Sequence, residues 1–298
     1  MSTLLNEDDH RAPTGEAGKA SAIDRIADVA VHLDGSGHDA TRLAHAQMLA
    51  SIFGTHVEGF FPNPIPTSFI PVGAGYERVA AELWEEGRAA GNDTEKAIRA
   101  RLERMGNGCA LRRVDGMPHE LAFAAARLAR TRDLFILGRP DDDRSLADMI
   151  AAVLFEAGSP ALIVPPEAAE PRDPQTIVVG WRDSTECSRT IAAALPFLKR
   201  AREVFLVSVA EATASEERHS EPAADMARHL ARHGVSVEVR HLPKWNRPAD
   251  ALLNEAKIVG AELIVSGAYG RSRLREMILG GVTRDLLKSC PISLLMCH

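Results

Sequence analysis

The chain has 298 residues, of which 45% are apolar and 26% are charged, and its formal net charge is −6. This composition is typical of a globular protein of about two domains. Acids and bases are interspersed without a basic stripe, which argues against nucleic acid or an anionic membrane surface as a partner. No run of about 18 apolar residues occurs, so we expect no membrane-spanning helix.

Residues 1–22 contain acids and a proline where a signal peptide needs a basic start and an apolar run. We expect a disordered tail and a cytoplasmic protein. The cysteines form no C-x-x-C motif, which indicates reduced, buried thiols rather than disulfides. They are Cys109, Cys187, Cys290 and Cys297.

The chain contains two similar halves. ADVAVHLDGS (27–36) and TIVVGWRDST (176–185) are apolar runs with an aspartate near the end, 149 residues apart. DLFILG (133–138) and ELIVSG (262–267) also match, 129 residues apart. The first half is therefore about 20 residues longer in its middle. We interpret FFPNPIPTSFIPVGAGYE (60–77) as the insertion, a loop rich in proline and glycine.

Short valine-, isoleucine- and leucine-rich runs alternate with amphipathic segments such as RPADALLNEAKIVGA (247–261). Near-continuous apolar strands indicate a parallel sheet that is covered on both faces. We predict two tandem Rossmann-like α/β domains, each a five-stranded parallel sheet with helices on both faces. We place the domains at 23–166 and 176–298, joined by a linker at 167–175.

The final strands of the halves, ALIVP (161–165) and ISLLMC (292–297), are both apolar. We expect the two halves to dock through these strands as an intrachain pseudo-dimer. A homodimer of such chains is a further option.

The stretch GAYGRSRLREMILGGVT (267–283) follows the fourth predicted strand of the second half and precedes a short helix. Ligands of parallel α/β sheets bind beyond the carboxyl ends of the strands. Unpaired N–H groups at a helix start attract anions, and glycine allows a phosphate to approach closely. The stretch therefore predicts a phosphate site, with a glycine-rich turn that holds no ligand as the alternative.

The spacing Gly267-x2-Gly270-x9-Gly280, followed by Val282 and Thr283, resembles the ATP-binding signature of the universal stress protein family. The resemblance covers both halves, so the chain is similar to tandem-domain members of the family. It implies a nucleotide site at Asp183, Val209, Gly267, Gly270, Gly280, Gly281, Val282 and Thr283, with the adenine near Asp183 and the phosphates on the glycine loop. ATP there would use Mg²⁺ to offset its charge.

Two features depart from that signature. Gly281 stands where the family usually has serine or threonine, which removes a hydroxyl donor to a charged ligand. Trp181 and Arg182 are bulky for residues beside an adenine pocket.

The first half argues against a second site. Its counterpart of the loop, GRPDDDRSLADMIAAVLFEAGSP (138–160), keeps Gly138 but has Asp141 in place of Gly270. Three consecutive carboxylates would repel a triphosphate. We therefore predict one nucleotide per chain, bound in the second half.

Other motifs are weaker. GSGHDA (35–40), with Glu58 further on, fits a dinucleotide fingerprint, but Asp34 would face the pyrophosphate, so we favour a helix-entry turn capped by Asp34 or Ser36. GEAGKA (15–20) lacks P-loop spacing and context.

Metal and catalytic motifs are also weak. His229 and His233 have the spacing of half a metal site without a third ligand. Asp141, Asp142 and Asp143 cannot all point one way to hold magnesium. No nucleophile has an evident base, so we expect no catalytic residue and no resident metal.

The expected function is that of an ATP-binding stress-response protein that acts by binding, through a protein partner that the sequence does not identify. One alternative is a nucleotide-free interaction module of the same fold. A second is a slow ATP hydrolase or nucleotidyl transferase.

Overall fold

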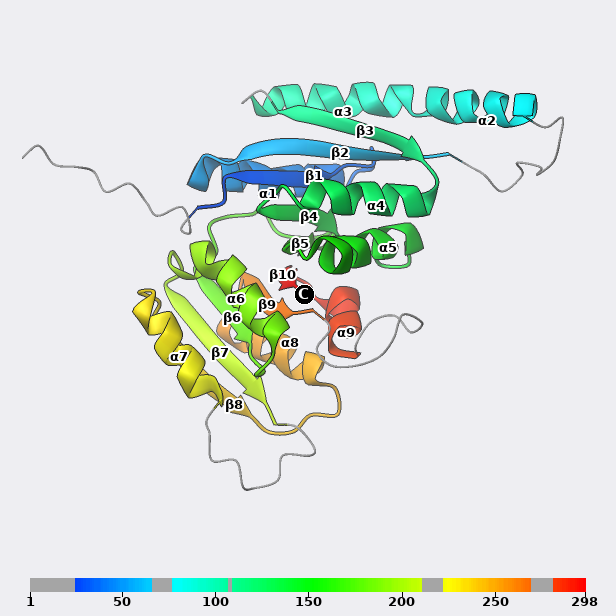
Figure 1. Ribbon diagram of the computed structural model, residues 1–298. Coiled ribbons are helices and arrows are strands. Elements are labelled where there is room, and N and C mark those ends of the chain that lie inside the picture. Colours follow the sequence, from blue (N-terminus) through cyan, green and yellow to red (C-terminus); the bar gives the residue numbers. More distant parts are fainter. Residues whose placement is uncertain (1–24, 66–76, 107–108, 211–221, 269–280) are drawn as a thin grey trace, which may run out of the picture.

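The computed structural model describes residues 25–65, 77–106, 109–210, 222–268 and 281–298 (Figure 1). The predicted tail at 1–22 and the motif at 15–20 lie outside these ranges. Helices and strands alternate along each half. In the first half they are β1 (Asp28–His32), α1 (Asp39–Phe53), β2 (His56–Pro64), α2 (Glu77–Ala90), α3 (Asn92–Met105), β3 (Ala110–Gly116), α4 (Pro118–Ala129), β4 (Leu134–Gly138), α5 (Arg144–Ala152), the π-helical turn η2 (Val153–Ala157) and β5 (Ala161–Val164).

The second half repeats this order with one helix fewer between its second and third strands, among the described residues. Its elements are β6 (Thr176–Gly180), α6 (Thr185–Leu198), β7 (Glu203–Val209), α7 (Pro222–Arg232), β8 (Glu238–Leu242), α8 (Pro248–Val259), β9 (Leu263–Gly267), α9 (Gly281–Ser289) and β10 (Ser293–Cys297). The two-half organisation follows the predicted alternation of strands and helices. The domain limits at residues 166 and 176 stay predictions.

All ten strands form a single sheet in the order β3-β2-β1-β4-β5-β10-β9-β6-β7-β8. Within each half the strands are parallel, whereas β5 and β10 pair antiparallel, with Leu295 opposite Leu162. The predicted five-stranded parallel units are therefore confirmed, and they join edge to edge through their last strands. The expectation that the halves dock through these strands is confirmed as well.

Helices cover both faces of the sheet (Figure 1). Alternate residues of a strand point to opposite faces, so Val29 and Val31 join one core while Ala30 joins the other. The first core contains buried residues of α1, α3, α6 and α7. The second contains those of α4, α5, η2, α8 and α9. Each core runs through both halves, so the pairing of the halves also has apolar packing behind it.

Local sequence signals set the ends of the helices. The Ser184 hydroxyl caps α6 by accepting a hydrogen bond from the Cys187 N–H at 3.3 Å. Proline at the first position of α8 needs no donor, and Gly260 ends that helix with a left-handed φ of 66°. The amphipathic character predicted for residues 247–261 is confirmed, because Ala251, Leu252 and Ala256 are buried and Val259 is half-buried.

The prediction of a loop over residues 60–77 is wrong at both ends. Residues 60–64 complete the buried strand β2, and Glu77 begins α2, while residues 66–76 lie outside the described residues. The Ile65 N–H bonds to Gly116 of β3, so the alternate positions Pro62 and Pro64 face the β1 side. The strand β1 has already ended at His32, and a missing proline N–H therefore costs no ladder bond there.

The extra length of the first half lies between its second and third strands. Residues 65–109 connect β2 to β3 and contain α2 and α3, whereas residues 210–237 connect β7 to β8. Helix α2 buries none of its residues and extends away from the sheet (Figure 1). The insertion is therefore largely helical.

None of the helices in the described ranges combines the length and apolar character needed to cross a bilayer.

Candidate functional site

Three parallel strands of the second half end at the same edge of the sheet. Gly180 ends β6, Val209 ends β7 and Gly267 ends β9, and β6 lies between the other two strands. Asp183 follows β6 directly and is exposed, while Val209 is half-buried. The sequence-predicted residues Asp183, Val209 and Gly267 therefore lie at the edge where ligands of such sheets bind.

Gly267 has a packing role that needs no ligand. A Cβ at this position would lie 2.8 Å from the Cys187 backbone nitrogen and 2.9 Å from its Sγ. The absent side chain lets the first turn of α6 approach β9 closely. This contact brings the start of α6, and Asp183 just before it, towards the end of β9.

The helix α9 begins at Gly281, whose added Cβ would meet no atom of the described residues within 4 Å. Gly281 is exposed, Val282 packs against the second core, and Thr283 is buried at 3% exposure. The accessible residue at this helix start is therefore the glycine, and Thr283 is a poorly accessible donor. The predicted Gly270 and Gly280 lie outside the described residues.

Trp181 does not crowd this edge. Its side chain is buried in the first core at 8% exposure. The backbone N–H of Trp181 donates to the Val207 carbonyl at 2.7 Å. Arg182 is exposed. Of the two bulky residues that the sequence places beside the expected adenine position, Trp181 therefore packs into the core and Arg182 is exposed.

At the matching edge of the first half, a guanidinium occupies the centre. Arg42 Nη2 contacts Asp34 Oδ1 at 2.9 Å and Asp39 Oδ1 at 2.6 Å, and its Nη1 lies 3.1 Å from His32 Nδ1. Asp39 is fully buried, and its second oxygen pairs with Arg101 at 2.9 Å. We refer to His32, Asp34, Asp39, Arg42 and Arg101 as the Arg42 cluster.

The Arg42 cluster shifts the titration of its members. Burial, reinforced by the Arg42 guanidinium, lowers the pKa of His32 to about 3. Burial acts to raise the pKa of Asp34, but Arg42 and the hydrogen bonds from Ser36 hold that pKa well below its usual range. At neutral pH the cluster therefore contains a neutral imidazole and an ionised Asp34.

The first-half loop uses its acids internally. Asp143 caps α5 by accepting from the Ser145 and Leu146 N–H groups at 2.9 and 3.1 Å. Asp141 pairs with Arg139 at 2.7 Å. A Cβ on Gly138 would lie 3.0 Å from Arg42 Nη1, so the guanidinium fills the space beside this glycine. Two cavities lie at this edge, one of about 180 Å³ beside Arg42 and Gly138 and one of about 490 Å³ between Asp34, the end of β2 and α2.

The dinucleotide alternative fails on geometry. Glu58 lies near the start of β2, away from the carboxyl edge, and it pairs with Arg112 and Arg132. Asp34 and Ser36 accept hydrogen bonds from the Ser36 and His38 N–H groups within the turn that leads into α1. The predicted capping by Asp34 or Ser36 is wrong, because the N-cap of α1 is His38, which makes no side-chain capping bond.

The other candidate motifs have ordinary structural roles. His229 and His233 stack edge to face at 4.7 Å, and no group of three or more metal-binding side chains occurs within the described part of the chain. The four cysteines are free, and all but Cys109 are buried.

The sequence reasoning missed the Arg42 cluster. Its members are dispersed over β1, the following turn, α1 and α3, and each looks like a surface residue by type. A signal was available, however. The spacing from Asp34 to Asp183, applied to Arg42, leads to Ile191, a buried apolar residue of the first core. An arginine at a position that is apolar in the other half indicates a specific local partner.

Two five-stranded parallel units, joined antiparallel and covered on both faces, define a Rossmann-like α/β protein of two similar halves. Residues 174–298 match the universal stress protein family. The match covers the second half of the chain, and the first half repeats the same fold.

Individual relatives agree with this assignment. Universal stress protein YxiE of Bacillus subtilis (strain 168) is 41% identical over 64 residues, which cover 21% of this chain and 42% of the relative. The alignment thus spans less than half of that curated relative.

Solved structures share the fold over nearly the whole chain. A universal stress protein from Archaeoglobus fulgidus DSM 4304 has a TM-score of 0.68 at 15% identity, covering 91% of this chain and 98% of that one. A functionally unknown protein from Pseudomonas aeruginosa PAO1 has a TM-score of 0.56 at 14% identity, covering 92% and 93%. At these identities the likeness concerns the fold, and function must be argued from the site.

Proposed function

We propose that the chain is a stress-response protein that binds one ATP, with Mg²⁺, at the carboxyl edge of its second half and acts by binding rather than by catalysis. The observation that carries the proposal is the difference between the two edges. Among the described residues of the second half, Val209 and Gly267 end strands at one edge, Asp183 follows the strand between them, and Gly281 is exposed at the start of α9. At the matching edge of the first half, Arg42 pairs with Asp34 and Asp39.

Each described residue has a role in this proposal. The N–H groups in the first turn of a helix attract a phosphate, and Gly281 at the start of α9 has no side chain to hinder its approach. Val209 offers an apolar contact to the adenine, and the exposed Asp183 carboxylate accepts a hydrogen bond from the nucleoside. Mg²⁺ is held mainly by phosphate oxygens, as is usual for this ion.

Calorimetric titration of the full chain with ATP and Mg²⁺ tests the proposal, and the expected stoichiometry is one. In the Gly281→Asp variant a carboxylate takes the position of the phosphate, so binding should be lost. The fold should survive, because the added Cβ meets no atom within 4 Å and an acid stabilises a helix start. Gly280→Asp should act in the same way.

The matched control is Asp141→Ala in the first half, which should leave ATP affinity unchanged. A stoichiometry of two, or full binding by Gly281→Asp, would contradict the assignment.

The absence of a hydroxyl at Gly281 and the burial of Thr283 favour a second candidate, a nucleotide-free interaction module. That candidate takes over if the intact chain binds no ATP at millimolar concentration. Release of ADP above the buffer rate would instead indicate the slow hydrolase.

A further inference from the structure

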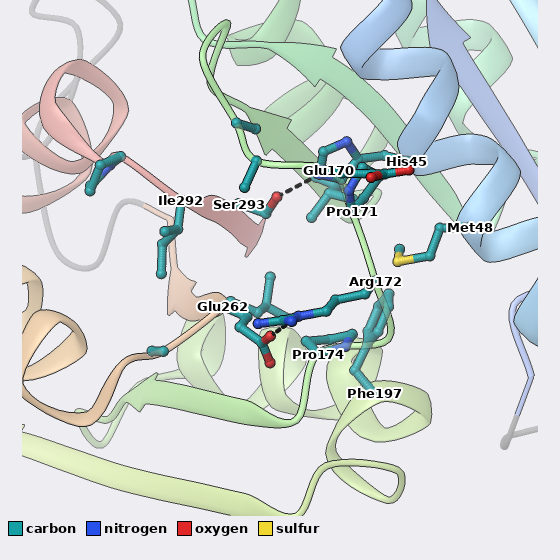
Figure 2. Close-up of a pocket in the computed structure, with 16 residues that line it drawn as sticks. His45, Met48, Glu170, Pro171, Arg172, Pro174, Phe197, Glu262, Ile292 and Ser293 are labelled. Atoms are coloured by element: carbon teal, nitrogen blue, oxygen red, sulfur yellow. Dashed lines mark hydrogen bonds and ion pairs between the residues drawn. The ribbon is translucent and has the colours of Figure 1, made fainter.

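A cavity of about 670 Å³ lies at the seam between the two halves (Figure 2). Its walls come from α1, from the segment 168–174 that joins the halves, from α6, and from the starts of β9 and β10. The volume is within the range of small-molecule sites in proteins. Because both halves contribute walls, the cavity exists only when they are paired.

The cavity is separate from the proposed nucleotide edge. It is lined by Ala261, Glu262 and Leu263, at the amino end of β9, whereas Gly267 ends that strand at the opposite edge. A ligand in the cavity therefore does not compete with one at α9, and the inference does not depend on ATP binding.

One wall of the cavity offers hydrogen-bond acceptors of defined geometry. His45 Nδ1 lies 2.8 Å from the Thr41 carbonyl, which can only accept, so Nδ1 carries the proton. Burial lowers the pKa of His45, which keeps the ring neutral. The His45 Nε2 is therefore an acceptor, and it accepts a hydrogen bond from the Ser293 hydroxyl at an N–O distance of 3.0 Å. The Ser293 Oγ retains lone pairs for a donor in the cavity.

The facing wall carries charge that is largely balanced within the protein. Glu262 accepts hydrogen bonds from the Gln175 and Thr176 N–H groups at 2.6 and 3.3 Å and pairs with Arg172. Glu170 adds a second carboxylate to the lining. Two carboxylates against one guanidinium disfavour an anionic ligand.

The remaining lining is apolar. Met48, Leu162, Phe197 and Ile292 are part of this lining, and Figure 2 shows Ile292 on one side of the cavity and Met48 and Phe197 on the other. Such walls suit a ring-containing body, which gains from leaving water.

We propose that the seam cavity binds a neutral small molecule with an apolar, ring-containing body and a hydroxyl or N–H group that donates to Ser293 Oγ, whose own hydroxyl is held by His45. Occupancy stabilises the pairing of the halves, because the ligand contacts residues of both and binds only the paired form.

The test uses 2-naphthol as the probe and the full chain with ¹³C-labelled methionine methyl groups. The Met48 resonance, assigned with Met48→Leu, should shift saturably, while those of Met149 and Met226 stay in place because these residues do not line the cavity. The matched compound 2-methoxynaphthalene, which lacks the donor, should bind up to about tenfold more weakly. The anion 2-naphthoate should bind more weakly than 2-naphthol.

Two variants locate the site. Ala168→Trp fills the cavity from the joining segment and should abolish the Met48 shift. Ala40→Trp places the same side chain at an exposed position of α1 and should leave the shift intact. A Met48 resonance that stays fixed at millimolar 2-naphthol would overturn the proposal. Equal affinity for the methoxy compound would overturn the assigned donor.

Discussion

The carboxyl edges of the two halves have the same backbone plan and opposite contents. In the second half the strands end at Gly180, Val209 and Gly267, Asp183 follows Gly180 by three residues, and Gly281 is exposed at the start of α9. In the first half the Arg42 guanidinium binds two carboxylates and lies against Gly138. A buried guanidinium that is paired within the protein has few donors left for a ligand. The two edges of the repeated fold therefore differ in their polar content, and this difference motivates the proposal that the second edge binds a ligand.

The largest expected effect comes from removing the guanidinium. Arg42→Ala leaves the buried Asp39 with Arg101 as its remaining side-chain partner and should lower the free energy of unfolding by about 3 kcal/mol. Urea unfolding followed by circular dichroism measures this. Arg99→Ala, which removes an exposed i,i+4 pair with Glu95, should cost at most about 0.5 kcal/mol. Equal stability of the two variants would show that the Arg42 cluster is not structural.

The pH dependence of stability should reflect His32. Its folded pKa of about 3 is below the ordinary value of 6.5, so the unfolded chain binds the proton more readily between these values. Stability is fully present above pH 6.5 and falls as the pH drops towards 3, by up to about 1.4 kcal/mol per pH unit. His45 acts in the same direction.

Urea midpoints measured at several pH values test this, and His32→Gln should reduce the slope near pH 5. An unchanged slope in that variant would mean that another group causes the pH dependence.

The two glycines of the second edge should respond differently to alanine. Gly267→Ala forces a Cβ against the backbone of α6 and should cost about 1–3 kcal/mol of stability. Gly281→Ala meets open space at a helix start and should be neutral or stabilise by up to about 1 kcal/mol. Thermal unfolding compares the two variants, and a destabilised Gly281→Ala would contradict the open edge.

The smallest change restores the hydroxyl that the signature leads one to expect. Gly281→Ser should tighten ATP binding by about tenfold, because a hydrogen bond to a charged group contributes about 1.5 kcal/mol or more. Calorimetry measures the difference. In the first half, Asp141→Ser, at the counterpart of Gly270, should create no ATP binding, since Arg42 still lies against Gly138. Binding by that variant would erase the distinction between the halves.

The sequence by itself determined the repeated alternation of strands and helices, the pairing of the two final strands, and the edge at which Asp183 and Gly267 lie. These features depend on local periodicity and on turn residues, which can be identified along the chain. Residues 60–64 of β2 were misread as a loop because Pro62 and Pro64 indicate a loop unless the end of the neighbouring strand β1 is known. Only the tertiary structure decided that Arg42 fills the first edge, that Trp181 turns into the core, and that a cavity lies under the joining segment. Each of these features depends on which residues from distant parts of the chain come into contact. A buried charge is tolerated only where such a contact supplies a partner of opposite charge or a hydrogen bond.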